Sequence, residues 1–251
     1  NPQEDVMYYL TWSEGFRPGL LNRPAGRQNA DKTYTVKPEI DTDEITNYEF
    51  GWKTITKDGQ LRFNGSAFYV DVTGLQSTIF DPSIVNLFFS DNAADATIKG
   101  VEGDFTYYTN VEGLSVAGAF SFLDTEITEK LVPTGDVIVG EELAFAPGMQ
   151  GNVRVRQEFG MAGGNLGHFQ LQFTYSDDSY SDIMEPNKAR QASYSYVDLR
   201  AGVTNDELTA ELYVDNVTDE RAEISNTFVF DRQRVAYIRP TTIGIRVKKN
   251  F

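Results

Sequence analysis

The side chains that most readily suggest chemistry are two pairs of neighbouring acids. Asp177 and Asp178 are consecutive, as are Glu141 and Glu142, and a glycosidase needs two carboxyl groups that face each other across a cleft. Both pairs lie in stretches that we predict to be loops, where successive side chains diverge. We therefore interpret them as solvated charges rather than as catalytic pairs.

Other constellations are also incomplete. Asp215, Asp219 and Glu220 offer oxygen ligands, but their spacing lacks the loop of a calcium-binding EF-hand. The glycine-rich stretch 160–167 is not followed by the Lys and Ser/Thr of a phosphate-binding loop. With no cysteine and a single histidine, His168, the chain excludes thiolate and multi-histidine sites. We therefore expect that the protein is not an enzyme and binds no metal or cofactor. We also expect His168 to have a structural role.

The final stretch, 236–251, shows the pattern that organises the chain. Ile243, Ile245 and Val247 are β-branched and apolar, and the residues between them are small or charged. This period of two predicts a strand with one apolar and one polar face. Because chain ends usually fray, the terminal aromatic residue Phe251 indicates a closing strand that must pair.

About nine stretches upstream repeat this alternation. In the clearest, Phe169, Leu171 and Phe173 alternate with polar residues. A blurred phase near Val70 and Val72 predicts a β-bulge, or the point where that strand leaves a membrane. The predicted strands are 6–16, 42–55, 60–79, 93–109, 114–130, 144–159, 168–175, 193–203, 208–217 and 236–251.

The connections between these strands alternate in length, and all the long ones fall on one side of the sheet. Outer-membrane β-barrels show this asymmetry, and their strands need only about 9 to 11 residues to cross a bilayer. Charged residues on the polar faces favour a wet lumen over a dry core. The alternative is an antiparallel sandwich with one solvated face per sheet. A formal charge of -15 makes a nucleic-acid partner unlikely.

Several segments together resemble the C-terminal half of a TonB-dependent outer-membrane receptor. Each is weak alone, but their order and spacing extend over nearly the whole chain. They are SEGFRPG (13–19), NYEFGWKT (47–54), LRFNGSAFYVDVTGLQ (61–76), NAADATIKGVEGDF (92–105), YVDLRAGV (196–203), YVDNVTDERA (213–222) and RPTTIGIRVKKNF (239–251).

The resemblance implies an all-β, antiparallel up-and-down transmembrane barrel of about 22 strands with a plugged lumen. Residues 1–251 would supply about ten C-terminal strands, with the plug and the TonB-contacting segment outside this sequence. Asn1 is not a start methionine, so we expect a longer protein. The implied function is an outer-membrane receptor and active transporter for a scarce solute, such as an iron–siderophore. A passive diffusion channel and a soluble β-sheet binding module remain alternatives.

The implied partners are the TonB complex, outer-membrane lipid, the barrel-assembly machinery and a small ligand such as a metal chelate. The long connections would then be extracellular and face the substrate. Arg17, Arg23 and Arg27 could clamp an anionic ligand, because guanidinium offers forked donors to carboxylates; otherwise they are solvated charges or contact lipid phosphates. Phe88 and Phe89 could form a ligand platform or belong to an interfacial aromatic girdle. Phe251 is expected to serve assembly.

Overall fold

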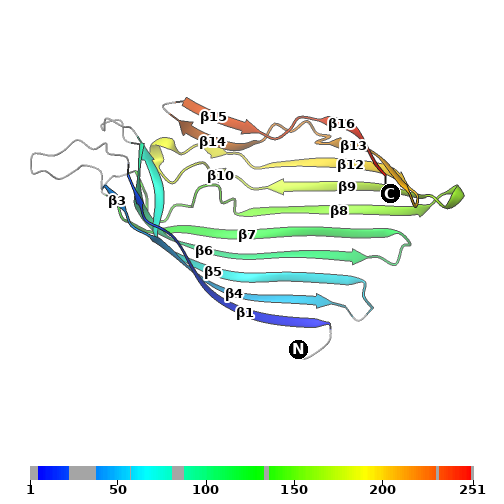
Figure 1. Cartoon of the computed structure of the whole chain (residues 1–251), viewed down its shortest axis with the longest axis horizontal. Helices are drawn as coiled ribbons and strands as arrows, with labels where there is room; N and C mark the ends of the chain where they lie inside the picture. Colours follow the sequence, from blue (N-terminus) through cyan, green and yellow to red (C-terminus); the bar gives the residue numbers. More distant parts are fainter. Residues whose placement is uncertain are drawn as a thin grey trace, which may run out of the picture.

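The computed structural model describes residues 5–22, 38–56, 58–80, 88–132, 136–229 and 232–249. Ten strands form one antiparallel sheet, and neighbours in the sheet follow the order of the chain (Figure 1). The predicted up-and-down arrangement is therefore confirmed. The strands are β1 (Val6–Arg17), β4 (Asp43–Ile55), β5 (Leu61–Phe80), β6 (Phe88–Tyr108), β7 (Leu114–Lys130), β8 (Met149–Gly160), β9 (Leu166–Ser176), β12 (Tyr194–Thr204), β13 (Leu208–Asp215) and β16 (Thr242–Lys249).

The connections confirm the predicted asymmetry. In Figure 1 the short turns lie at the right-hand end of the sheet and the long connections at the left. Part of each of three long connections folds into a short strand pair that the sequence did not predict: β2 (Leu20–Leu21) with β3 (Glu39–Ile40), β10 (Ser179–Tyr180) with β11 (Arg190–Gln191), and β14 (Glu223–Val229) with β15 (Arg232–Tyr237). Two 3-10 turns, η1 (Ala162–Gly164) and η2 (Glu185–Asn187), complete the elements. No helix among the described residues is long and apolar enough to cross a membrane.

One face of the sheet is apolar across its whole width. The exposed fraction is 83% for Leu10, 70% for Ile243 and 74% for Ile245, which is far more apolar exposure than water favours over so large an area. A single row of directly paired residues crosses eight strands on this face: Ile243, Val214, Leu199, Leu171, Val155, Val116, Tyr107 and Leu61. This face fits the hydrocarbon of a bilayer.

Aromatic rings on the apolar face lie across glycines of the adjacent strand. The Trp52 indole covers Gly65, and a Cβ atom at Gly103 would stand 2.9 Å from the Phe120 ring. Such rings shield the glycine backbone and help to fix the register of the strands.

Three predicted strand boundaries differ from the structure by five residues or more. Strand β8 begins at Met149, not at 144, because Phe145 has a left-handed φ of 55° and its main-chain nitrogen donates to Tyr180 O at 2.7 Å. Strand β6 begins at Phe88, not at 93, because its first residues continue the ladder with β5. The last strand begins at Thr242, not at 236, because residues up to Tyr237 pair with β14.

The predicted bulge is confirmed. The register between β5 and β6 shifts between Val72 and Leu75. Gly74 there has a φ of 68°, and its main-chain nitrogen donates to Asp95 Oδ1 at 2.7 Å.

Candidate functional site

The polar face of β9, β12, β13 and β16 carries a compact network of charges. The Glu211 carboxylate, only 12% exposed, accepts a hydrogen bond from Arg246 Nη1 at 3.2 Å and lies 3.5 Å from Arg200 Nη1. His168 Nε2 lies 3.1 Å from its other oxygen. Arg200 also donates to Asp215 at 3.1 Å. Each partly buried charge therefore has a partner, as a desolvated charge requires.

The network depends on a glycine in the intervening strand. His168 and Glu211 both pair with Gly202 of β12, and a Cβ atom there would stand 2.6 Å from His168 Cε1. The absence of that atom lets the imidazole reach across the strand. His168, which is 5% exposed, is thus packed against the polar face of the sheet.

A small apolar core lies at the opposite end of this face, where the long connections fold over the sheet. It joins β5, β6 and β7 to the connections 131–148 and 177–193. Hydrogen bonds hold the two connections together: Phe145 N donates to Tyr180 O at 2.7 Å and Glu185 N to Asp136 O at 2.9 Å. The buried members of this core are Ile79, Ala93, Ala94, Ile127, Val132, Val137, Ile183 and Met184.

Lys188 ties the same two connections electrostatically. Its ammonium donates to Glu141 at 2.7 Å and to Glu185 at 2.9 Å, and lies 4.5 Å from the centre of the Tyr180 ring. Burial acts to lower the pKa of Lys188, but the hydrogen bonds to the two carboxylates outweigh it, and the pKa lies above its ordinary value. The connections thus form one ordered cap rather than separate loops.

The acid pairs of the sequence are divided between different partners. Asp178 accepts from Arg190 Nε at 2.7 Å, and this hydrogen bond holds the pKa of Asp178 below its ordinary value. Asp177 instead accepts from its neighbour's main-chain nitrogen at 3.0 Å. Glu141 contacts Lys188, whereas Glu142 is exposed.

The described residues contain no cluster of side chains that could ligate a metal ion. No group of three or more His, Asp or Glu side chains there is placed to hold a metal ion. Of the acids considered as calcium ligands, Asp215 forms an ion pair with Arg200, and Asp219 accepts a hydrogen bond from Thr241 N at 3.2 Å.

Asn216 organises the last long connection. It is 4% exposed and has a left-handed φ of 52°. Its Nδ2 donates to Glu220 O and Arg239 O, both at 2.9 Å, and its Oδ1 accepts from Glu220 N at 2.9 Å. These bonds bring the start and the end of the connection together beside β13. Sequence reasoning did not single out Asn216, although it lies within the segment YVDNVTDERA.

Arg17, the first predicted ligand residue, already has a partner. It ends β1, and its Nε donates at 2.7 Å to Asp43, a fully buried carboxylate at the start of β4. Arg17 Nη2 contacts the same oxygen. Gln76 Nε2 donates to Pro18 O at 3.2 Å and to Asp41 O at 3.0 Å, which ties this connection to β5. Asp43 was not predicted, and only its position at a strand start could have indicated it.

The other predicted residues are dispersed or lie beyond the described ranges. Phe89 is half-buried and packs against the apolar core rather than standing free. The backbone of Phe88 pairs with Phe80 as the first residue of β6. Arg23, Arg27 and Phe251 lie outside the described residues.

A family model described as "TonB dependent receptor-like, beta-barrel" matches residues 1–217. The chain belongs to the TonB-dependent receptors. These are β-barrels of the bacterial outer membrane, which is where the chain is located, and the family consists of transport receptors rather than enzymes. Among curated proteins, no sequence matches the chain.

Solved structures show the same fold at low sequence identity. The ferric yersiniabactin uptake receptor FyuA from Yersinia pestis has a TM-score of 0.75 at 19% identity, over 99% of this chain and 35% of that one. The ferric preacinetobactin receptor BauA from Acinetobacter baumannii gives 0.72 at 17%, over 98% and 34%. The siderophore receptor PiuA from Acinetobacter baumannii gives 0.70 at 16%, also over 98% and 34%. The chain thus spans about a third of the length of these receptors.

Proposed function

We propose that the chain is part of a receptor and active transporter that takes a scarce solute across the outer membrane with energy supplied through TonB. The cargo class that we propose is a ferric chelate of the siderophore type. Membership of the family supports the proposal, as do the solved relatives, which are described as a ferric yersiniabactin uptake receptor, a siderophore receptor and a ferric preacinetobactin receptor.

The observation that carries the proposal is that the long connections form a cap over the polar face of the ten-stranded sheet. The sheet turns an apolar face outward and a charged face inward, and the long connections fold over the inward face through an apolar core and the Lys188 contacts. A simple diffusion channel needs a polar wall, whereas a receptor also needs ordered side chains at the entrance to recognise its ligand.

We also propose the domain arrangement that the sequence suggested. Residues 1–251 are the C-terminal part of the barrel, and the plug and the TonB-contacting segment belong to the rest of a longer protein. The chain's coverage of about a third of FyuA supports this assignment. Outer-membrane lipid and the barrel-assembly machinery are the further partners that we propose, with Phe251 acting in assembly.

The proposed ligand residues remain Arg17, Arg23, Arg27, Phe88 and Phe89. For Arg17 the proposal is now narrower, because its guanidinium is half exposed while two of its nitrogens contact Asp43. A ligand carboxylate would have to share the guanidinium with that buried acid.

Uptake of radioactive ferric chelates by cells that express the full-length gene tests the function. We expect uptake that stops when TonB is deleted and when the receptor gene is deleted. Uptake that persists without TonB would favour a passive channel. Extraction of the protein from cells without detergent would favour a soluble binding module.

A further inference from the structure

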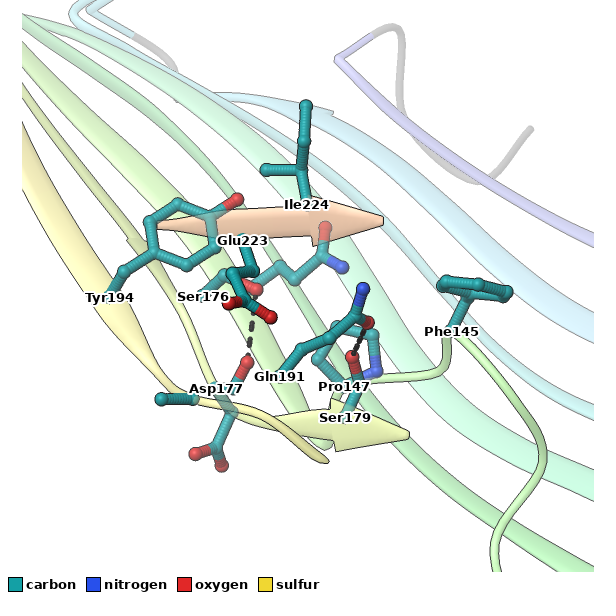
Figure 2. A pocket seen from close by; sticks show the side chains of 11 residues that line it. Phe145, Pro147, Ser176, Asp177, Ser179, Gln191, Tyr194, Glu223 and Ile224 are labelled. Atoms are coloured by element: carbon teal, nitrogen blue, oxygen red, sulfur yellow. Dashed lines mark hydrogen bonds between the residues drawn. The ribbon is translucent and has the colours of Figure 1, made fainter. Parts of the chain in front are cut away.

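A pocket of about 110 Å³ opens where three of the long connections meet (Figure 2). Phe145 and Pro147 come from the connection before β8, Ser179 and Gln191 from the one before β12, and Glu223 from the one before β16. Ser176 pairs directly with Gln150 and with Tyr194 on the polar face of the sheet, so the pocket lies at the entrance side of the inner wall. A group bound here would contact all three connections at once.

Buried polar side chains line part of the pocket. Ser176, Ser179 and Gln191 are each at most 9% exposed. In the amide orientation that satisfies its neighbours, Gln191 donates to Ser179 Oγ at 3.0 Å and accepts from the main-chain nitrogens of Ser225 and Asn226 at 3.2 Å. Gln191 thereby holds strand β14, and with it Glu223, in place beside the pocket.

The lining carries negative charge, and the carboxylate that faces the pocket is that of Glu223 (Figure 2). The lining includes Asp177 and Glu223 but no Lys, Arg or His. Among the residues that the structure describes, Glu223 accepts from two neutral groups, Asn226 Nδ2 at 3.1 Å and the Tyr237 hydroxyl at 3.3 Å. Within the described part of the chain, neither acid forms an ion pair, unlike neighbouring Asp178, which contacts Arg190.

Aromatic rings complete the lining. In Figure 2 the side chains of Tyr194 and Phe145 lie on opposite sides of the group that contains Glu223 and Gln191. A cation is attracted both by an unpaired carboxylate and by the face of an aromatic ring. An anion at this place would meet the Glu223 carboxylate and no cationic side chain in the lining. The Asp177 carboxylate points away from this group in Figure 2 and accepts from Asp178 N at 3.0 Å.

We propose that this pocket binds a primary ammonium group carried by the cargo. The inference rests on the proposed function and narrows it to cargo that bears an amine. A cavity of about 150 Å³ accommodates a benzene molecule, so a pocket of about 110 Å³ suits a short aminoalkyl arm rather than a whole chelate. The ammonium contacts Glu223, and the arm lies between the rings.

Ligand-observed NMR with the full-length receptor in detergent micelles tests the pocket without knowledge of the cargo. The probes are n-butylammonium and, as an uncharged match, n-butanol. We expect the wild-type receptor to bind n-butylammonium at least about tenfold more tightly than n-butanol, since hydrogen bonds to charged groups exceed neutral ones by roughly that factor. Equal binding of the two probes by the wild type overturns the proposal, and this comparison requires no variant.

Substitution then locates the site. Glu223→Gln keeps the shape and removes the charge, and we expect it to abolish most of the preference for n-butylammonium. Glu220→Gln is the matched control, because Glu220 lies in the same connection but does not line the pocket. A preference that survives Glu223→Gln, or that Glu220→Gln removes equally, overturns the assignment.

The two proposals can fail separately. TonB-dependent uptake of ferric chelates without a preference for n-butylammonium retains the transporter and rejects the pocket. A preference that depends on Glu223, in a receptor whose deletion leaves uptake of ferric chelates unchanged, retains the pocket and rejects the proposed cargo class.

Discussion

Replacement of Asn216 should loosen the last long connection more than any other single polar substitution in it. In Asn216→Ala, two carbonyl oxygens lose their donor and Glu220 N loses its acceptor. The alanine must also adopt the left-handed φ of 52° that asparagine tolerates. Asn216→Gly loses the same side-chain bonds but tolerates that backbone conformation, so the two variants separate the contributions.

The magnitude follows from these contacts. Four side-chain hydrogen bonds are lost, but the Thr218 hydroxyl, which donates to Asn216 Oδ1 at 3.3 Å, is exposed and can bond water instead. The other three, at about 1 kcal/mol each, give about 3 kcal/mol for Asn216→Gly. The left-handed conformation adds about 1 to 2 kcal/mol for Asn216→Ala. These are free energies of local opening of residues 216–241, because strand pairing elsewhere in the sheet is unchanged.

Amide hydrogen exchange of the receptor in lipid vesicles, followed by mass spectrometry, measures this opening. Since about 1.4 kcal/mol is tenfold in an equilibrium constant, peptides from 216–241 should exchange about 100-fold faster in Asn216→Gly and about tenfold faster again in Asn216→Ala. Peptides from β9 serve as the internal reference. Unchanged exchange in both variants would refute the role of the side chain, and equal exchange in the two would refute the conformational contribution.

Three further predictions concern the wall and the cap. Arg17→Ala leaves the buried Asp43 carboxylate without its cation and should lower the free energy of unfolding by about 2 to 3 kcal/mol. The double variant Arg17→Ala/Asp43→Ala should recover part of this loss, and urea titration in vesicles measures both. The pKa of Lys188 is raised in the folded state. Its stabilisation is therefore fully present below the ordinary lysine pKa of about 10.4 and is lost as the pH rises through the folded-state pKa. Protease cleavage of the cap should increase in that pH range in the wild type, whereas Lys188→Met should be cleaved readily at every pH. Gly202→Ala places a Cβ atom 2.7 Å from a backbone carbonyl and should cost about 1 to 3 kcal/mol in thermal unfolding, whereas Gly160→Ala, with nothing within 4 Å, should be neutral.

The strands could be predicted from the sequence because each has to satisfy two different surroundings. Ile243, Ile245 and Val247 alternate with polar residues, and the structure places them on the outward face. The tight turns predicted at 56–59, which contains an Asp-Gly pair, and at 110–113 likewise follow from their residue types. Alternation therefore encodes the sheet and its two faces, and the lengths of the connections indicate on which side of the sheet the long ones lie.

The cap could not be predicted, because its contacts join residues distant in sequence. Lys188 and Glu141 lie 47 residues apart, and neither stands in a periodic pattern. The same limit applies to Arg17. The sequence leaves it open as a ligand clamp, a solvated charge or a lipid contact, and its partner Asp43 lies 26 residues away. Hairpin β14–β15 was missed because its residues lack clear alternation, and Gln191 from another connection helps to hold it.

Strands β5 and β6 contain 20 and 21 residues, about twice the 9 to 11 that a bilayer requires. The surplus of roughly ten residues, at about 3.4 Å per residue and a tilt near 45°, extends the sheet about 24 Å beyond the hydrocarbon on the side of the long connections. A solute would then meet the sheet above the lipid surface, and the chain that forms it carries a formal charge of -15. Such a charge concentrates cations from dilute solution and slows the entry of anions, so the rate of capture should depend on ionic strength even where the final affinity does not.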